Sequence, residues 1–297
     1  MRKLLFSFLI LGSACALATE ADWSASVELG YGYDSNVAVD DVDLATERGD
    51  QFHDLSLSAG VESALDENWT LNADVTLSEK KYRTFDAFDG RLALLSLNLE
   101  RKYRRVDFGL AVRHIDYQLD HEGFLALTQY SPSLSWFVSR SIYLRAAYEY
   151  SDERFDRQSA RDNQQDLLSL RAYWFMNGLK QYLLFHARHA DDDASDERFS
   201  NQSTEYILRF HQSFDVGAKD VTLALAVRYQ ERDYDRFNSA PVVKRKDRRT
   251  RFEVSLELPV SERFALIARV SDNDYRSNLE VADYAQRVAS LTLRYER

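Results

Sequence analysis

The sequence contains very little cysteine, very little proline and no long apolar run. Cys15 is the only cysteine among 297 residues, so no disulfide can form within the chain. Beyond the first eighteen residues, no run approaches the roughly 18 apolar residues of a membrane-spanning helix. The mean hydropathy of −0.46 by itself suggests a soluble protein. However, 3 prolines beside 17 tyrosines and 17 phenylalanines favour a β-rich chain.

The amino-terminal segment resembles a secretory signal. Arg2 and Lys3 give it a basic start, Leu4–Leu11 form an apolar core, and Ala16-Leu17-Ala18 offers a small-x-small cleavage site. We therefore predict a signal peptide over residues 1–18 and one domain over residues 19–297.

A lipoprotein signal that ends at Cys15 is the alternative interpretation of the amino-terminal segment. It is disfavoured because Gly12 stands where a leucine would be usual. Removal of the signal takes two of the 38 basic residues and leaves all 48 acidic residues, so the mature net charge is 36 − 48 = −12. This charge argues against nucleic acid as a partner.

From residue 22 onward, apolar and polar residues alternate with a period of two, which is the pattern of β-strands with one apolar face. The alternation predicts fourteen strands, in the segments 23–33, 55–61, 69–77, 95–99, 106–112, 130–136, 142–150, 168–174, 183–188, 206–210, 221–229, 252–258, 264–270 and 289–295. Pro132 falls inside the sixth of these strands, and we expect a β-bulge there because proline removes a ladder hydrogen bond.

The connections between these segments alternate in length. Six are short (65–68, 101–105, 138–141, 177–180, 215–220 and 259–263), and seven are longer and polar (34–50, 83–90, 118–123, 152–163, 191–201, 233–247 and 275–283). Bacterial outer-membrane barrels have short periplasmic turns and long external loops. The sequence therefore predicts an all-β fold, an antiparallel up-and-down transmembrane β-barrel of about 14 strands in the outer membrane.

A soluble β-sandwich or propeller would also alternate, but neither alternative fits this sequence well. A sandwich rarely needs fourteen strands, and a propeller would repeat about every 40 residues. The four tryptophans give a further indication, because Trp23 and Trp69 open two segments and Trp136 and Trp174 close two others. We expect all four at the periplasmic rim, as an interface girdle.

The polar face of the predicted strands is charged. Its predicted lumen-lining residues are Glu28, Asp54, Asp74, Glu100, Asp107, Arg113, Arg145, Arg171, Arg188, Arg209, Arg228, Arg251, Arg269 and Arg294, and Glu149, Glu205, Glu253, Glu257 and Glu296 share this face. The first five strands are mainly acidic, and strands seven to eleven each carry an arginine. Two interpretations are open: a transverse field across a water-filled channel, or charges that pair and plug a narrow interior.

No catalytic or metal-binding arrangement stands out. His186 and His189 are three residues apart, so on a strand they point to opposite faces and cannot share one metal ion. No Ser/His/Asp set or carboxylate pair is evident near a rim. We predict that the protein is not an enzyme and has no cofactor and no metal.

The predicted external loops carry strong charge. Acidic clusters occur at 40–43, 152–156 and 191–197, and a basic run occurs at 244–249. The acidic clusters could bind divalent cations that bridge to lipopolysaccharide, and the basic run could contact lipid phosphates, whereas the alternative for both is a solvated surface. The expected partners are outer-membrane lipid, lipopolysaccharide and the barrel assembly machinery, which would recognise the last strand.

The segment Gly32-Tyr33-Asp34-Ser35-Asn36 resembles the start of the barrel in the surface lipoprotein assembly modifier family. The closing hairpin, with Tyr275-Arg276-Ser277-Asn278 and then 287–295, is similar to the closing strands of that family. The resemblance implies a fourteen-stranded barrel and a surface lipoprotein or polysaccharide client. Members often carry tetratricopeptide repeats before the barrel, whereas here the first strand begins about four residues after the cleavage site. Asp34 is expected to pair with a lumen arginine.

Three functions are compatible with this sequence. The first is a porin-like channel that passes small polar or charged solutes through a lumen with opposed arginine and carboxylate arcs. The alternative is an export or assembly factor for a surface lipoprotein or exopolysaccharide. The third is a structural or adhesive barrel that acts through its acidic loops.

Overall fold

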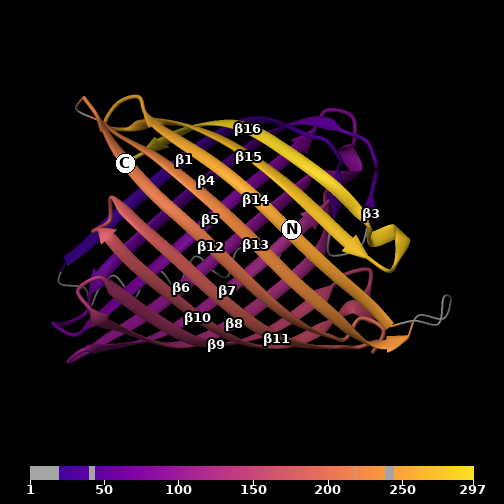
Figure 1. The fold of residues 1–297 in the computed structure, drawn as a ribbon, viewed down its shortest axis with the longest axis horizontal. Helices are drawn as coiled ribbons and strands as arrows, with labels where there is room; N and C mark the ends of the chain where they lie inside the picture. The colour runs from indigo at the N-terminus through magenta and orange to yellow at the C-terminus, as the bar shows by residue number, and fades with distance from the viewer. Residues whose placement is uncertain (1–19, 40–43, 218, 238–243) are drawn as a thin grey trace.

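The computed structural model describes residues 20–39, 44–217, 219–237 and 244–297, so the predicted signal peptide and Cys15 lie outside the described residues. Fourteen strands form a closed barrel (Figure 1). They are β1 (Glu20–Asp34), β4 (Asp50–Ala64), β5 (Trp69–Tyr82), β6 (Gly90–Tyr103), β7 (Val106–Leu119), β8 (Glu122–Ser139), β9 (Ile142–Phe155), β10 (Asn163–Asn177), β11 (Gln181–Ala194), β12 (Asn201–Val216), β13 (Lys219–Phe237), β14 (Lys244–Pro259), β15 (Phe264–Ser277) and β16 (Tyr284–Glu296).

The remaining elements are small and lie in the loops. A two-stranded hairpin, β2 (Ala38–Val39) and β3 (Leu44–Ala45), belongs to the loop after β1. Three short 3₁₀ turns, η3 (Asp86–Phe88), η4 (Ser159–Arg161) and η5 (Glu280–Ala282), belong to later loops at the same end of the barrel. Within the described residues, no helix has the length and apolar character needed to cross a membrane.

Each barrel strand pairs in antiparallel fashion with its neighbours in sequence, and β1 closes the ring on β16, where Glu28 faces Arg294. Figure 1 shows the strands crossing the barrel obliquely. All fourteen predicted segments fall inside these strands, which confirms the predicted fold. The strands are 13 to 19 residues long, as β16 and β13 show, and so extend beyond the predicted segments.

One predicted external loop is not a loop. The segment 118–123 contains only a two-residue turn, because β7 ends at Leu119 and β8 begins at Glu122. Asp120 and His121 have positive φ angles of 51° and 62°. Two consecutive left-handed residues are typical of the type I′ turn, whose twist matches that of the flanking strands, and this turn replaces the longer connection that polarity alone suggested.

The predicted bulge at Pro132 is also wrong. Pro132 pairs regularly with Leu110 of β7. Toward β9, the register is the same before and after the proline, from Tyr130↔Tyr150 to Ser133↔Ala147. The register shifts of β8 lie instead near its two ends. The missing proline N–H therefore interrupts the ladder locally without adding a residue to the strand.

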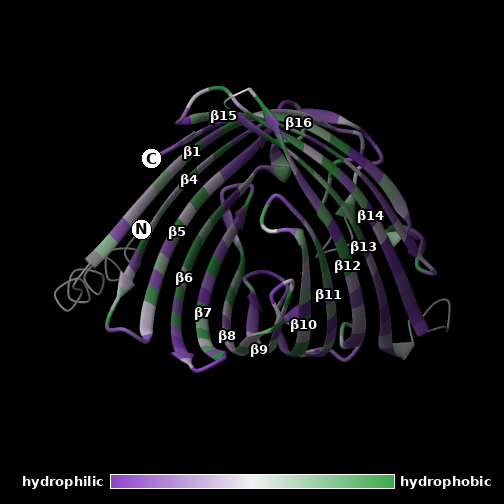
Figure 2. Cartoon of the chain, turned by 60° about the vertical axis from the view of Figure 1, so that its left-hand side comes forward, coloured by the Kyte–Doolittle hydropathy of each residue, from purple (hydrophilic) through white to green (hydrophobic). Residues whose placement is uncertain are grey.

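The outer face of the barrel carries an apolar band. On β7, for example, Phe108 and Leu110 point outward and are 49% and 46% exposed. Figure 2 shows hydrophobic and hydrophilic residues alternating along the strands, as expected when only alternate residues face lipid. Large exposed apolar side chains such as Leu208 and Leu291 continue the band around the barrel.

Charged residues bound the band on the side of the long loops. Outward ion pairs there include Arg91–Glu79, Arg248–Glu231 and Arg287–Asp272, with N–O distances of 2.6, 3.3 and 2.6 Å. The basic run at 244–249 divides between the two faces of β14. Arg245 and Asp247 of this run are buried and paired with each other at 2.7 Å. These two residues therefore fit neither the predicted contact with lipid phosphates nor the alternative of a solvated surface.

Candidate functional site: the charged inner wall

The strand register places all fourteen predicted lumen residues on one face of the barrel wall. Direct partners across the ladder include Arg145 and Arg171, and Arg188 and Glu205. Contacts between strands that are not neighbours identify this face as the inner one. Arg145 of β9 lies 3.9 Å from Glu100 of β6, across two intervening strands. Side chains converge in this way only on the concave side of a curved sheet.

The inner charges are distributed unevenly around the barrel. Strands β1, β4, β5, β6 and β7 carry Glu28, Asp54, Asp74, Glu100 and Asp107, which we call the acidic arc. Strands β9 to β13 carry Arg145, Arg171, Arg188, Arg209 and Arg228, which we call the arginine arc. The middle strands of the two arcs, β5 and β11, are six strands apart in a ring of fourteen. The arcs therefore lie nearly opposite one another across the lumen.

The arginine arc contains carboxylates of its own. Glu205 is only 3% exposed and accepts hydrogen bonds from Arg188, at 3.2 Å, and from Arg228. Glu149 accepts a 2.9 Å hydrogen bond from Gln129 and lies 4.0 Å from Arg188. These two buried carboxylates offset part of the positive charge of the arginine arc.

Of the nine arginines among the predicted lumen residues, three form no ion pair within the described ranges. Arg113 donates to Gln129 Oε1 at 2.9 Å, and Arg171 donates to His186 Nε2 at 3.4 Å, which requires His186 to be neutral. Arg209 is the third. In the acidic arc, Glu28, Asp74 and Asp107 likewise form no ion pair within those ranges. Charge of both signs is therefore available to a solute in the lumen.

Several inner charges are accessible to water. Arg251, Arg269 and Arg228 are paired with carboxylates, yet their side chains are 43%, 53% and 46% exposed. A barrel of eight strands is filled by its own side chains, whereas fourteen strands enclose a wider interior. The exposure of these arginines indicates that this part of the lumen is hydrated.

The four tryptophans lie at the rim formed by the short turns and point outward. Trp23 lies near the start of β1, Trp69 starts β5, and Trp136 and Trp174 lie near the ends of β8 and β10. Trp23 is 68% exposed. The Arg101 guanidinium lies 5.2 Å from the ring centroid of Trp69. Indole rings in this position suit a membrane interface, where one side is apolar and the other is wet.

The segment Gly32–Asn36 forms a buried junction at the outer end of β1. Asp34 is 1% exposed and accepts hydrogen bonds from the Asn36 N–H at 3.0 Å, Tyr82 Oη at 3.0 Å and Gln286 Nε2 at 2.9 Å. Its cationic neighbour is Lys80, at 4.0 Å, and not the arginine that we expected. Sequence spacing gave no signal for Gln286, because it is 252 residues away from Asp34.

The junction joins the beginning and the end of the barrel. Asn36 Nδ2 donates to the Ala285 carbonyl at 3.1 Å, and the Arg287 N–H donates to Ser35 Oγ at 2.8 Å. The close packing explains why residue 32 is a glycine, because a Cβ at this position would lie 2.6 Å from the Ala289 carbonyl. The motif therefore fixes the first loop against β16, where the barrel closes.

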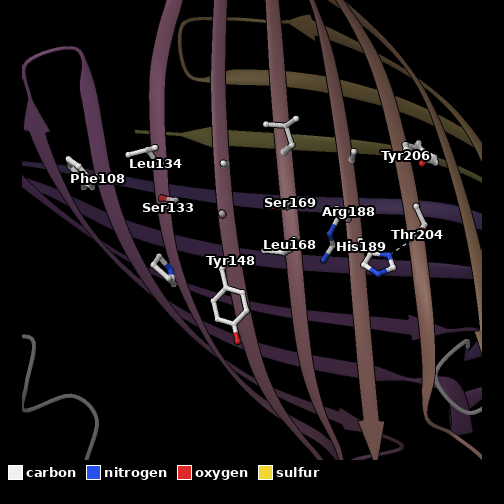
Figure 3. A pocket seen from close by; sticks show the side chains of 15 residues that line it. Phe108, Ser133, Leu134, Tyr148, Leu168, Ser169, Arg188, His189, Thr204 and Tyr206 are labelled. Carbon is white, nitrogen blue, oxygen red and sulfur yellow. Dashed lines mark hydrogen bonds between the residues drawn. The ribbon is translucent and has the colours of Figure 1, made fainter. Parts of the chain in front are cut away.

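A groove of about 640 Å³ lies outside the lumen and crosses the outer face of β7 to β12 (Figure 3). Its floor contains the small residues Ala146 and Ala187, and Tyr206 stands on one side. His189 Nδ1 lies 3.0 Å from Thr204 Oγ1 in this groove. Because it opens on the apolar band, it is a surface for lipid and not for a solute of the lumen.

An apolar exterior around a charged interior defines a transmembrane β-barrel, a class found in bacterial outer membranes. In fold, the chain is similar to "Anion-selective porin from Comamonas acidovorans", at 8% identity and a TM-score of 0.56 over 94% of this chain and 99% of that chain. It is also similar to a loop-deletion mutant of OmpT, an outer membrane protein of Vibrio cholerae, at 8% identity and a TM-score of 0.52 over 93% and 99%. No family model and no curated protein matches the sequence.

Proposed function

We propose that this protein is a channel for small polar or charged solutes in the outer membrane. The observation that carries the proposal is the hydrated inner wall, on which an acidic arc lies nearly opposite an arginine arc. Charges fixed on a pore wall attract solutes of opposite sign and orient dipolar ones. The similar porin from Comamonas acidovorans is described as anion-selective. For this chain, selectivity is proposed from its own charges.

Neutralisation of the unpaired lumen charges should shift ion selectivity in opposite directions. In planar bilayers under a salt gradient, a triple variant with Arg113, Arg171 and Arg209 changed to Gln should lower the anion-to-cation permeability ratio by at least about twofold, because it removes only positive charge from the wall. The matched triple variant Glu28→Gln, Asp74→Asn and Asp107→Asn should raise the ratio. The measured quantity is the reversal potential. Wild-type bilayers that stay silent across voltage and pH would exclude the channel.

A second candidate function is export or assembly of a surface lipoprotein or exopolysaccharide. It is favoured by the resemblance of Gly32–Asn36 to the surface lipoprotein assembly modifier family and by the burial of Asp34 and Asn36 in that segment. Deletion of the gene in the native host should then remove a surface lipoprotein or polysaccharide and leave solute uptake unchanged. Slower solute uptake with an intact surface would favour the channel instead.

A further inference from the structure

A patch of apolar side chains lies on the inner wall of the barrel, in the half that carries the long loops. Leu94, Ile115 and Leu127 are direct neighbours across β6, β7 and β8. One row closer to the outer rim, Leu92, Tyr117 and Leu125 are neighbours in the same way. All six residues occupy inward positions and are half-buried, and we call them the apolar patch.

The strand pairing by itself does not require apolar residues at these six positions. The next inward positions of β6 carry the polar residues Ser96 and Asn98. Exposure of apolar surface to a hydrated lumen costs about 25 cal/mol per Å². Partly exposed apolar side chains that gather in one place are typical of a binding surface. The place of the apolar patch on the inner wall excludes membrane lipid and a second copy of the chain as occupants.

The outer edge of the apolar patch is held in place by aromatic packing. The rings of Tyr117 and Phe124 meet edge to face with centroids 5.8 Å apart. Phe124 contacts Phe155 of β9 in the same way at 5.7 Å. This cluster fixes the patch as a preformed surface on the wall.

A cationic residue borders the apolar patch on the side that faces away from the long loops. Arg113 is two residues before Ile115 on β7 and therefore points into the lumen directly below it, about 7 Å along the strand. It forms no ion pair within the described residues and donates one hydrogen bond to Gln129. A recess beside it is lined by Arg113, Ser131, Arg145, Ala147, Glu149, Ser169 and Arg171. This recess contains three arginines and a single carboxylate, that of Glu149, which already accepts a hydrogen bond from Gln129.

We propose that the apolar patch and Arg113 together bind small organic monoanions that carry an apolar group. The carboxylate of such a solute pairs with the Arg113 guanidinium, and its apolar group packs on Ile115, Leu94 and Leu127. Arg113 and Ile115 are only about 7 Å apart along the strand, so one small solute can contact both positions. An aryl carboxylate offers the anionic group and the apolar group that these two features would bind. The proposal rests on the proposed channel only in that the solute reaches the site through the lumen.

Equilibrium binding to the full chain in lipid nanodiscs tests this site without any requirement for conductance. Saturation-transfer nuclear magnetic resonance should show that benzoate binds at least about fivefold more tightly than acetate, which lacks the ring, or benzyl alcohol, which lacks the charge. Empty nanodiscs report partitioning into lipid, and that signal is subtracted.

Variants separate the two halves of the site. Arg113→Gln should weaken benzoate binding about tenfold, since it removes a charge-assisted contact. The double variant Ile115→Thr and Leu127→Thr should lower benzoate binding to the level of acetate. Ile207→Thr is the matched control, because Ile207 is an inward aliphatic residue of β12, five strands away from β7, and its replacement should leave benzoate binding unchanged. Circular dichroism checks that each variant retains its barrel.

The results distinguish the site from the channel. Equal affinities for benzoate and acetate, or benzoate binding that is insensitive to Arg113→Gln, would overturn the site even if the bilayer conducts. A tenfold loss in Arg113→Gln with retained folding supports the site even if the bilayer is silent, and silence then counts against the channel alone.

Discussion

Leu97→Arg is expected to lower the free energy of unfolding by about 2–4 kcal/mol, because an arginine on the lipid face near the middle of the membrane must be buried in hydrocarbon. Leu97 points outward from β6, is 39% exposed and has Ala73 and Val112 as its ladder neighbours. No carboxylate is available at these neighbouring positions to compensate an added charge.

Ser96→Arg is the matched control for this prediction. Ser96 is the adjacent residue on the same strand, but it points into the lumen between Asp74 and Arg113. An arginine there remains hydrated and gains Asp74 as a partner, so we expect a change within about 0.5 kcal/mol. Urea titration of both variants refolded into lipid vesicles measures the difference. Equal destabilisation of the two variants would show that the assignment of the two faces is wrong.

Glu205→Gln is expected to have the second largest effect, about 2–3 kcal/mol of destabilisation. The buried Glu205 carboxylate joins Arg188 and Arg228. Its neutralisation leaves Arg228 without a countercharge and leaves Arg188 only Glu149, at 4.0 Å. Removal of one partner of a buried ion pair is costly, although the partial exposure of both arginines, 30% and 46%, moderates the cost here. The same vesicle titration measures this loss.

Glu253→Gln separates the effect of burial from that of pairing. Glu253 also lies between two arginines, Arg251 at 2.7 Å and Arg269 at 3.9 Å, but its side chain is 21% exposed. The two arginines are themselves 43% and 53% exposed, so water compensates the lost carboxylate and the expected cost is below about 1 kcal/mol. A loss in Glu253→Gln as large as that in Glu205→Gln would show that burial does not set the strength of these pairs.

Glu205→Gln should also change ion selectivity. Because the variant adds net positive charge to the arginine arc, the anion-to-cation permeability ratio should rise, in the same direction as for the acidic-arc triple variant. Agreement between the selectivity shifts of Glu205→Gln and the acidic-arc triple variant would show that Glu205 contributes both to the stability of the wall and to its charge.

The strand pattern could be predicted because each strand must present alternate residues to lipid and to water. A shift of the strand by one residue would place Asp74 or Arg171 in hydrocarbon. The period of two therefore fixes which face every residue occupies. The turn at Asp120-His121 could not be predicted in this way. The polarity of the segment 118–123 predicts only that it is exposed at the rim. The positive φ angles of Asp120 and His121, which the sequence does not reveal, show that the two strands continue through most of this segment.

The partners of the charged residues depend on contacts that sequence spacing does not contain. Glu205 meets Arg228 because β12 and β13 are in one register, and Asp34 meets Gln286 only because the ring closes. The apolar patch could not be predicted from the sequence for a related reason. Around Leu94 both phases of the strand are apolar, so the period of two is lost locally, and only the pairing with Ile115 and Leu127 shows that these side chains gather on the lumen wall.

By itself, the sequence determined the number of strands, their two faces and the charge of the interior, because the contrast between lipid and water acts on every residue separately. The tertiary structure alone decided which charges are paired, which remain available to a solute and where apolar residues meet inside the lumen. These properties depend on strand register and ring closure, which bring together residues that are far apart in the chain.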